Sequence, residues 1–270
     1  MKKIFLLILA ALFILPISSE AKTEKNKGIG IVAHRGFWNC EEAGYAQNSV
    51  AALRCAQEAG LWGSEFDVKM TADSVLIVYH DSKIGEYTIE THPYSRFKDM
   101  KLANGENIPT LDDYLIQAKK YPKTMLVYEF KGLSDPASED LFLDLTIKKL
   151  KEHKLLNPKR VMFISFSIHL CRKIAEHLPG FTVQFLGSSR NPDELAADGI
   201  NGVDYNHAVY TKYPDWYNMA RKNNMSVNSW TVNTQEDMLR MFELGVDQIT
   251  TDNPLQVRNL LKGSGYKEIR

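Results

Sequence analysis

The sequence has few cysteines and lacks the common nucleotide-binding and serine-hydrolase motifs. Only Cys40, Cys55 and Cys171 occur among 270 residues, without C-x-x-C spacing, which argues against a structural zinc site and a full disulfide framework. Cys40 and Cys55 are candidates for a pair in an oxidising compartment, although Cys55 also fits a small buried side chain. The Gly-x-Gly at residues 28–30 precedes an expected strand instead of following it, and neither a Walker-type loop nor G-x-S-x-G occurs.

The chain also lacks net charge, low-complexity tracts and internal repeats. Its 33 basic and 33 acidic residues cancel, and no basic block is present, so we expect no nucleic-acid partner. With 44% hydrophobic and 24% charged residues, the composition is that of a globular protein. No Gly/Ser linker divides the chain, which favours one domain.

A single long hydrophobic run lies at the N-terminus. Lys2 and Lys3 precede the apolar stretch 4–15, and the small-x-small sequence at 19–21 follows, which predicts a secretory signal over residues 1–21. The stretch would span about 18 Å as a helix, too short for a hydrocarbon core of about 30 Å. We therefore expect export to the periplasm or the outside, with residues 22–270 as the mature domain. Membrane contact after cleavage is possible but not indicated.

The mature chain alternates short β-rich runs with amphipathic helical patterns, which is typical of a parallel sheet with crossover helices. About eight such units in some 250 residues favour an α/β fold of the (β/α)8 TIM-barrel type over a doubly wound sheet. Residues 81–108 interrupt the pattern and are predicted to form a small insertion after the second strand region, over the barrel mouth. The expected strands are 30–33, 65–69 with 75–79, 125–130, 161–165, 182–186, 202–204, 226–232 and 247–250. The expected helices are 49–59, 111–120, 138–153, 168–177, 213–223 and 235–242.

Three carboxylates fall where neighbouring strands are expected to end. Glu65 and Asp67 are two residues apart, so both point to one face of their strand, and Glu129 occupies the next strand. Because carboxylates that meet in a barrel mouth repel one another, a cation is expected to neutralise them, and oxygen ligands favour Ca²⁺ or Mg²⁺. The alternative is a structural ion-pair network with Lys131 and Arg35.

Two histidines follow strands that would end at the same mouth. His34 and His80 each stand beside a charged residue, which favours a general acid and base pair over satisfied core histidines. Arg35 and Lys131 suit an anionic oxygen, and the guanidinium offers a bidentate fork for phosphate. Two histidines, a hard cation and a cationic clamp together indicate hydrolysis of a phosphodiester.

The ordered motifs of the chain resemble those of the glycerophosphodiester phosphodiesterase family. The resemblance covers about residues 31–260, and the family's members are (β/α)8 barrels with a small insertion after the His-Asp motif. One departure is Gln47, where the family usually has Glu, so that a charge is lost while hydrogen-bonding reach is kept. The matching segments are Ala33-His34-Arg35-Gly36, Gln47-Asn48-Ser49, Glu65-Phe66-Asp67-Val68, Val78-Tyr79-His80-Asp81, Ile108-Pro109-Thr110-Leu111, Glu129-Phe130-Lys131, Trp230-Thr231-Val232-Asn233 and Thr251-Asp252-Asn253-Pro254.

The resemblance implies a mechanism and roles for individual residues. A substrate hydroxyl beside the phosphoester attacks phosphorus, and water opens the resulting cyclic phosphate to give an alcohol and glycerol 3-phosphate. The implied roles are general base and acid for His34 and His80, phosphate contacts for Arg35 and Lys131, and Ca²⁺ or Mg²⁺ binding for Glu65, Asp67 and Glu129.

Two positions have open roles, and two further functions are compatible with the sequence. Trp230 fits an apolar wall for the glycerol or plain barrel filling, and Asp252 is expected to start a helix. One alternative function is cleavage of intact phospholipids of the phospholipase C or D type, with an apolar rim from Phe37, Trp38, Tyr94 and Phe97. The other is an inactive barrel that serves as a binding module, which predicts the loss of a histidine or carboxylate that the sequence retains.

Overall fold

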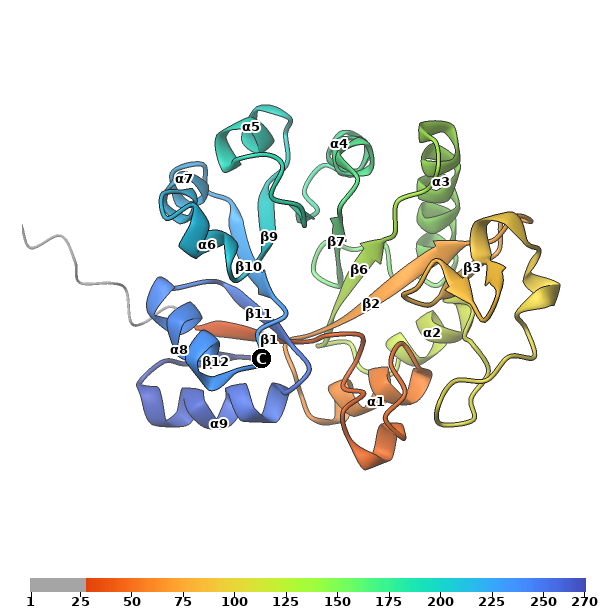
Figure 1. Ribbon diagram of the computed structural model, residues 1–270, viewed down its shortest axis with the longest axis horizontal. Coiled ribbons are helices and arrows are strands. Elements are labelled where there is room, and N and C mark those ends of the chain that lie inside the picture. Colours follow the sequence, from red (N-terminus) through yellow and green to blue (C-terminus); the bar gives the residue numbers. More distant parts are fainter. Residues whose placement is uncertain (1–27) are drawn as a thin grey trace, which may run out of the picture.

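A computed structural model describes residues 28–270, and eight of its strands close into a parallel barrel (Figure 1). Strands pair in the order β1-β11-β10-β9-β8-β7-β6-β2, and β1 also pairs with β2, which closes the ring. The predicted TIM barrel is therefore confirmed, whereas the signal-peptide prediction lies outside the described residues. The barrel strands are β1 (Ile29–Ala33), β2 (Gly63–Met70), β6 (Met125–Phe130), β7 (Val161–Ser165), β8 (Val183–Phe185), β9 (Gly202–Asn206), β10 (Ser226–Trp230) and β11 (Gln248–Thr251).

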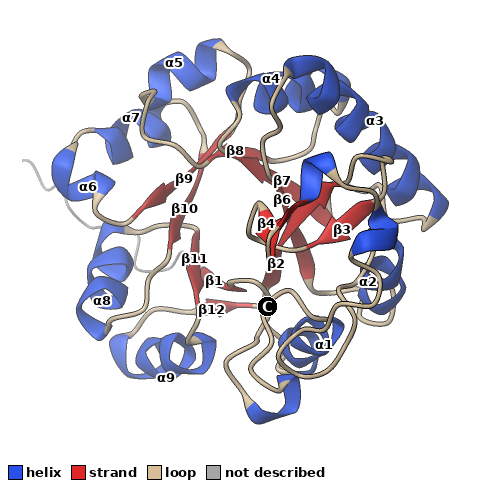
Figure 2. Cartoon of the chain, turned by 45° about the vertical axis from the view of Figure 1, so that its right-hand side comes forward, coloured by secondary structure: helices blue, strands red, loops and turns tan. Residues whose placement is uncertain are grey.

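Helices form a ring around the strands (Figure 2). The six helical segments expected from the periodicity are confirmed. The short helices α5 and α6 were not expected, because six and four residues are too few for a clear period, and α9 was expected only through a helix start at Asp252. Within residues 28–270, no helix is long and apolar enough to cross a membrane. The helices are α1 (Val50–Glu58), α2 (Leu111–Ala118), α3 (Pro136–Glu152), α4 (Ile168–His177), α5 (Pro192–Ala197), α6 (Val209–Lys212), α7 (Trp216–Lys222), α8 (Gln235–Leu244) and α9 (Pro254–Ser264).

The two faces of each barrel strand carry different side chains. Phe66 of β2 and Tyr128 of β6 point outward into the large core between strands and helices. Val127 of β6 points inward and packs with Ile164 and Val32 in the barrel interior. Because side chains alternate along a strand, Glu65 and Asp67, on either side of Phe66, face the barrel interior. Glu129, next to Tyr128, does the same.

The insertion is a small folded unit at the surface of the barrel rather than a structureless loop. It follows β3 (Leu76–Val78), which pairs antiparallel with β2, and contains a hairpin of β4 (Lys83–Ile84) and β5 (Tyr87–Thr88) turned at Gly85, whose φ is +60°. The 3-10 helices η2 (Ile89–Thr91) and η3 (Tyr94–Arg96) follow, as does η1 (Glu41–Ala43) in the β1–α1 loop; β12 (Glu268–Ile269) pairs with β1. A small core of its own stabilises the insertion: Ile77, Ile84, Ile89, Phe97 and Ile108.

This core excludes part of the aromatic rim considered for a phospholipase. Phe97 is fully buried within the insertion, and Phe37 packs against the main core. The three cysteines are free thiols; Cys40 packs against Cys55, and Cys171 is buried in α4. Neither these two phenylalanines nor the three cysteines form an exposed apolar surface.

Helix α2, which connects the insertion to the barrel, begins with a reciprocal cap. The Thr110 side chain accepts a hydrogen bond from the Asp113 amide, and the Asp113 carboxylate accepts one from the Thr110 amide. Replacing Thr110 with Ala is expected to lower the free energy of unfolding by about 1 kcal/mol and Tm by about 2–4 °C. Thermal unfolding followed by circular dichroism measures this, with the exposed Ser95→Ala as control. Equal melting temperatures for the two variants would contradict the assigned cap.

Candidate active site

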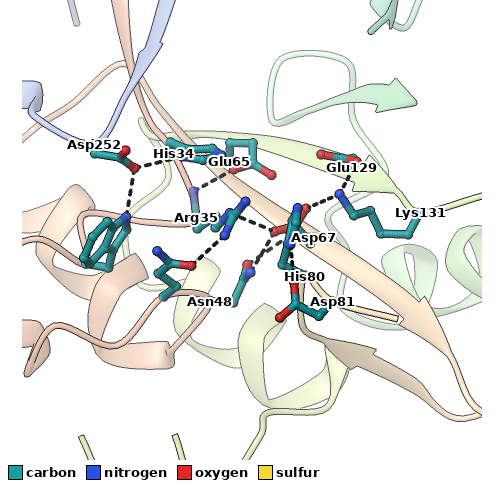
Figure 3. Close-up of polar contacts among 12 residues, drawn as sticks. His34, Arg35, Asn48, Glu65, Asp67, His80, Asp81, Glu129, Lys131 and Asp252 are labelled. Carbon is teal, nitrogen blue, oxygen red and sulfur yellow. Dashed lines mark hydrogen bonds and ion pairs between the residues drawn. The ribbon is translucent and has the colours of Figure 1, made fainter. Parts of the chain in front are cut away.

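Three buried carboxylates meet inside the barrel mouth. The pairing of β2 with β6 places Asp67 directly opposite Glu129, and Glu65 lies two residues earlier on β2. One oxygen from each side chain lies within 4.8 Å of the others, and all three residues are buried. Figure 3 shows the three side chains among the charged residues around them. The structure therefore brings together the three residues that the sequence analysis proposed as metal ligands.

The charges around these carboxylates are only partly balanced by protein groups. Lys131 Nζ lies 2.7 Å from Glu129 and 3.0 Å from Asp67. Burial raises the pKa of Glu65 well above its usual value, with Asp67 and Glu129 adding to the effect. Burial and the Asp67 charge raise the pKa of Glu129 to about 8. Burial acts in the same direction on Asp67, but Lys131, His80 and a hydrogen bond from Asn48 outweigh it and lower the pKa to about 2.

A hard divalent cation fits this cluster. The Oε1 atom of Glu65 is buried and has no hydrogen-bond partner, although its Oε2 accepts a hydrogen bond of 2.6 Å from the Arg35 amide. An unsatisfied buried carboxylate oxygen is costly, and a cation would satisfy it. Because every donor atom is a carboxylate oxygen, the set matches Ca²⁺ or Mg²⁺ rather than zinc.

The raised pKa of Glu129 predicts how pH affects stability without a cation. Between the ordinary value of 4.5 and the folded value of about 8, the folded protein binds this proton more tightly than the unfolded chain. The free energy of unfolding therefore falls as pH rises through that window. A cation displaces the proton, so Ca²⁺ should raise Tm more at about pH 8.5 than at about pH 5.5. Thermal unfolding at both pH values tests this, and an equal gain at both would contradict it.

A tight turn after β1 positions His34 and the cationic side chain of Arg35. Arg35 has a φ of +55°, and Gly36 a φ of +78°. A Cβ at Gly36 would lie 2.7 Å from the Cβ of Ala52, so only glycine fits against α1. Arg35 holds its left-handed conformation because its amide donates to Glu65. The turn thereby ties the backbone of Arg35 to the carboxylate cluster.

Asp252 has a different role from the one expected from the sequence. The cap of α9 is Asn253, so the expectation that Asp252 starts the helix is wrong. Instead its Oδ1 lies 2.8 Å from His34 Nδ1 and accepts a hydrogen bond of 3.0 Å from Trp38 Nε1. Asn233 donates to Oδ2 at 2.6 Å. A carboxylate at Nδ1 fixes the ring and leaves Nε2 for proton transfer.

This contact would make Asp252 a positioning residue for His34, and its loss is measurable. Asp252→Asn is expected to lower kcat by about tenfold to a hundredfold with little change in KM, because the imidazole loses its preferred tautomer and orientation. The pH profile of kcat should also shift, which loss of a merely structural contact would not cause. Asp113→Asn, at a distant helix cap, is the control. Unchanged kcat and an unchanged pH profile in Asp252→Asn would refute the role.

His80 reaches the mouth from the antiparallel partner of β2. The amide of Tyr79 donates to the carbonyl of Asp67, which anchors the segment, and His80 follows. His80 Nδ1 lies 2.7 Å from Asp81 Oδ1, so this ring is also paired with a carboxylate. Burial lowers the pKa of His80, against the opposing effect of the Asp67 charge. A lowered pKa favours the neutral ring, whose basic nitrogen can accept a proton.

The segment that departs from the family pattern supports Arg35 and Asp67. Gln47 Oε1 accepts a hydrogen bond of 2.7 Å from Arg35 Nη1, so it keeps the contact without cancelling the guanidinium charge. Asn48 donates to Asp67 Oδ2 at 2.7 Å and accepts from the Asp67 amide. Ser49, the next residue, is the N-cap of α1, and its side chain accepts a hydrogen bond from the Ala52 amide. The sequence analysis missed the role of Asn48 in holding Asp67.

One cavity of about 180 Å³ connects these groups, and we term it the axial pocket. Trp230 lines it, with Nε1 donating to the Asp204 carbonyl at 2.8 Å and Phe166 against its ring edge-on. Trp230 thus lines the pocket and also packs against the cluster inside the barrel. Asp204 escaped the sequence analysis; burial and the Glu129 charge raise its pKa well above the usual value. The axial pocket is lined by His34, Arg35, Glu65, His80, Glu129, Lys131, Ile164, Phe166, Leu186, Asp204, Trp230, Thr231 and Thr250.

A (β/α)8 barrel with carboxylates, two histidines and two cations at the C-terminal strand ends has the features of a phosphoester hydrolase. The model of the "Glycerophosphoryl diester phosphodiesterase family" matches residues 34–256. The chain therefore belongs to this family, and it is an enzyme that hydrolyses glycerophosphodiesters.

Individual relatives agree with the family assignment. A glycerophosphodiester phosphodiesterase from Caldanaerobacter subterraneus is 28% identical over 87% of this chain and 98% of that relative. A crystal structure of a glycerophosphodiester phosphodiesterase from Parabacteroides distasonis has a TM-score of 0.85 and 38% identity, over 88% of this chain and 98% of that one. An Oleispira antarctica phosphodiesterase, solved with the product sn-glycerol-3-phosphate, has the same fold, with a TM-score of 0.75 and 20% identity over 87% of this chain and 97% of that one.

Proposed function

We propose that this enzyme converts glycerophosphodiesters into an alcohol and glycerol 3-phosphate by histidine acid-base catalysis with one divalent cation, Ca²⁺ or Mg²⁺. One observation carries the proposal: two histidines, each with a carboxylate at Nδ1, line the same pocket as the buried carboxylate cluster. The product bound to the Oleispira antarctica relative is sn-glycerol-3-phosphate, which fits the proposed product.

Two cationic side chains line the pocket that would take the phosphate group. Arg35 and Lys131 both line the axial pocket, as do His34 and His80. Gln47 holds Nη1 of the Arg35 guanidinium, and Nε lies 3.8 Å from Asp67 Oδ2. Both cations would stabilise the negative charge that develops on the phosphoryl oxygens in the transition state.

The proposed reaction has two steps with balanced proton transfers. In the first, His34 takes the proton of the glycerol hydroxyl next to the phosphoester, and that oxygen bonds to phosphorus. The bond to the leaving alcohol breaks as His80 donates a proton to its oxygen. In the second, His80 takes a proton from water, the water oxygen bonds to phosphorus, and the ring opens as His34 returns its proton to the glycerol oxygen.

Glu65, Asp67 and Glu129 are the residues that would hold the cation. A divalent cation held there would supply Lewis-acid stabilisation of negative charge on the reacting oxygens. Lys131 remains bonded to Glu129 and Asp67, which keeps these carboxylates oriented toward the pocket. The cluster thus contributes charge, and the histidines contribute proton transfer.

Phosphorus-31 NMR during turnover in H₂¹⁸O tests the proposed reaction. The expected result is a transient cyclic glycerophosphate signal, followed by glycerol 3-phosphate with one ¹⁸O on phosphorus. A phosphorylated head group released together with free glycerol would mean cleavage of the other ester bond. Direct formation of product without a cyclic species, under conditions where added cyclic phosphate is hydrolysed slowly, would refute the intermediate.

Export of the chain is part of the proposal. The basic start, short apolar run and small-x-small sequence of residues 1–21 support it. Determining the N-terminal residue of the protein produced in its native cell tests this, since a start at Lys22 is expected. A mature chain that keeps Met1 would refute it.

A further inference from the structure

A second cavity lies beside the axial pocket, and the reaction proposed above does not yet use it. This cavity of about 300 Å³, the insertion-side pocket, lies between the β1–α1 loop and the insertion. Arg35 and His80 line both cavities, whereas His34, Glu65 and Glu129 line only the axial pocket. A phosphodiester has one alcohol on each side of phosphorus. A phosphate held by Arg35 beside His80 therefore extends one alcohol into each cavity.

The position of the histidines decides which alcohol enters which cavity. The glycerol hydroxyl that attacks phosphorus needs a base, and His34 is available only in the axial pocket. The carboxylate cluster lies on the same side. The leaving alcohol needs a proton donor, and His80 stands at the boundary of both cavities. The glycerol thus belongs in the smaller axial pocket and the leaving alcohol in the larger insertion-side pocket.

The polar lining of the insertion-side pocket is more cationic than anionic. Arg35 contributes a guanidinium, and Lys101 contributes an ammonium from the insertion. Gln47 and Asn48 contribute uncharged amides. The one carboxylate of the lining, Asp81, is bound to His80 Nδ1. With Arg35 engaged by the phosphate, a trimethylammonium head group would face the Lys101 ammonium, whereas hydroxyl or anionic groups find donors.

We propose that the insertion-side pocket binds the leaving alcohol, and that Lys101 makes it prefer polyhydroxyl or anionic head groups to quaternary ammonium ones. The insertion supplies the residue that sets this preference. Lys101 is exposed and donates to Asn107, so it is held at the pocket rim without being neutralised. This inference rests on the proposed function, because it uses the two histidine roles.

The test compares glycerophosphoinositol with glycerophosphocholine. In the full chain with Ca²⁺, kcat/KM is measured for wild type, Lys101→Glu and the control Lys98→Glu. Lys98 is an exposed lysine of the same insertion that does not line the pocket. Lys101→Glu should change the inositol-to-choline ratio by about tenfold or more in favour of choline, because one charge is reversed at the rim. Lys98→Glu should leave the ratio within about twofold of wild type, as a screened distant charge does.

The outcomes separate the inference from the function on which it rests. An equal ratio in wild type and Lys101→Glu, with both enzymes active, would overturn the assigned preference while leaving the proposed function intact. An inactive, folded wild type would refute the proposed function itself.

A second variant tests the placement of the leaving alcohol by size. Ala103 lines the insertion-side pocket and is exposed, so Ala103→Trp should fill space there without disturbing the fold. We expect KM for glycerophosphoinositol to rise about tenfold, with a smaller rise for glycerophosphoethanolamine, since the larger head group loses more room. Equal effects on both substrates would place the leaving alcohol elsewhere.

Discussion

Replacing either histidine with alanine is expected to lower kcat by about 10²–10⁴-fold, the range of general acid-base catalysis. His34 and His80 line one pocket, and each has a carboxylate at Nδ1. Both side chains are partly exposed, so their removal should leave Tm nearly unchanged. Steady-state kinetics and thermal unfolding measure the two effects. His177→Ala, at an exposed position in the last turn of α4, is the matched control and should retain full activity.

The two histidine variants should also differ from each other. If His80 protonates the leaving alcohol, a substrate with a p-nitrophenol leaving group needs little protonation and should largely restore the rate of His80→Ala. It should not restore His34→Ala, which lacks the base. If the p-nitrophenol substrate restored the rate of His34→Ala alone, the assigned acid and base roles of His34 and His80 would be reversed. Full activity of both variants on natural substrates would refute acid-base catalysis by this pair.

Removal of the divalent cation or of one carboxylate is expected to lower the rate by at least about 10³-fold, since Lewis-acid stabilisation contributes several kcal/mol. Asp67→Asn should have this effect because Asp67 is the carboxylate held ionised by Lys131. A chelator should stop the wild type reversibly, with activity restored by Ca²⁺ or Mg²⁺.

Calorimetric titration gives a readout of the same site that does not depend on turnover. Wild type should bind one cation per chain, and Asp67→Asn should bind it at least about tenfold more weakly. Glu106→Gln, a carboxylate that accepts from the amides of α1, serves as the control and should bind the cation normally. Activity indifferent to chelation, with no heat on titration, would refute the metal site.

The barrel and the metal-ligand candidates were predictable because they depend on local sequence. Alternation of strands and helices fixes a parallel sheet, and the two-residue spacing of Glu65 and Asp67 fixes a shared face. The structure adds that Glu129 lies opposite Asp67 across β2 and β6. That register follows from the pairing of two strands far apart in the chain, which no local pattern contains.

Contacts between distant segments explain what was missed. Asp252 lies 218 residues from His34 and reads locally as the start of α9, so its role as a partner of His34 needs the closed barrel. Asn48 reads as part of a helix cap, yet it holds Asp67 through two hydrogen bonds. Asp204 is a single carboxylate in a short strand, and only burial beside Glu129 marks it. The insertion lacked periodicity because its core is built from scattered isoleucines and Phe97.

The most direct test of the account is an assay of purified residues 22–270 on glycerophosphodiesters, with Ca²⁺, with Mg²⁺ and with a chelator. Enzymatic detection of glycerol 3-phosphate reports the reaction, and Asp67→Asn is run beside the wild type. We expect glycerol 3-phosphate to form only in the presence of a divalent cation, and only with the wild-type chain. A folded wild type that releases none on any head group, or that releases it equally with chelator, would contradict the account.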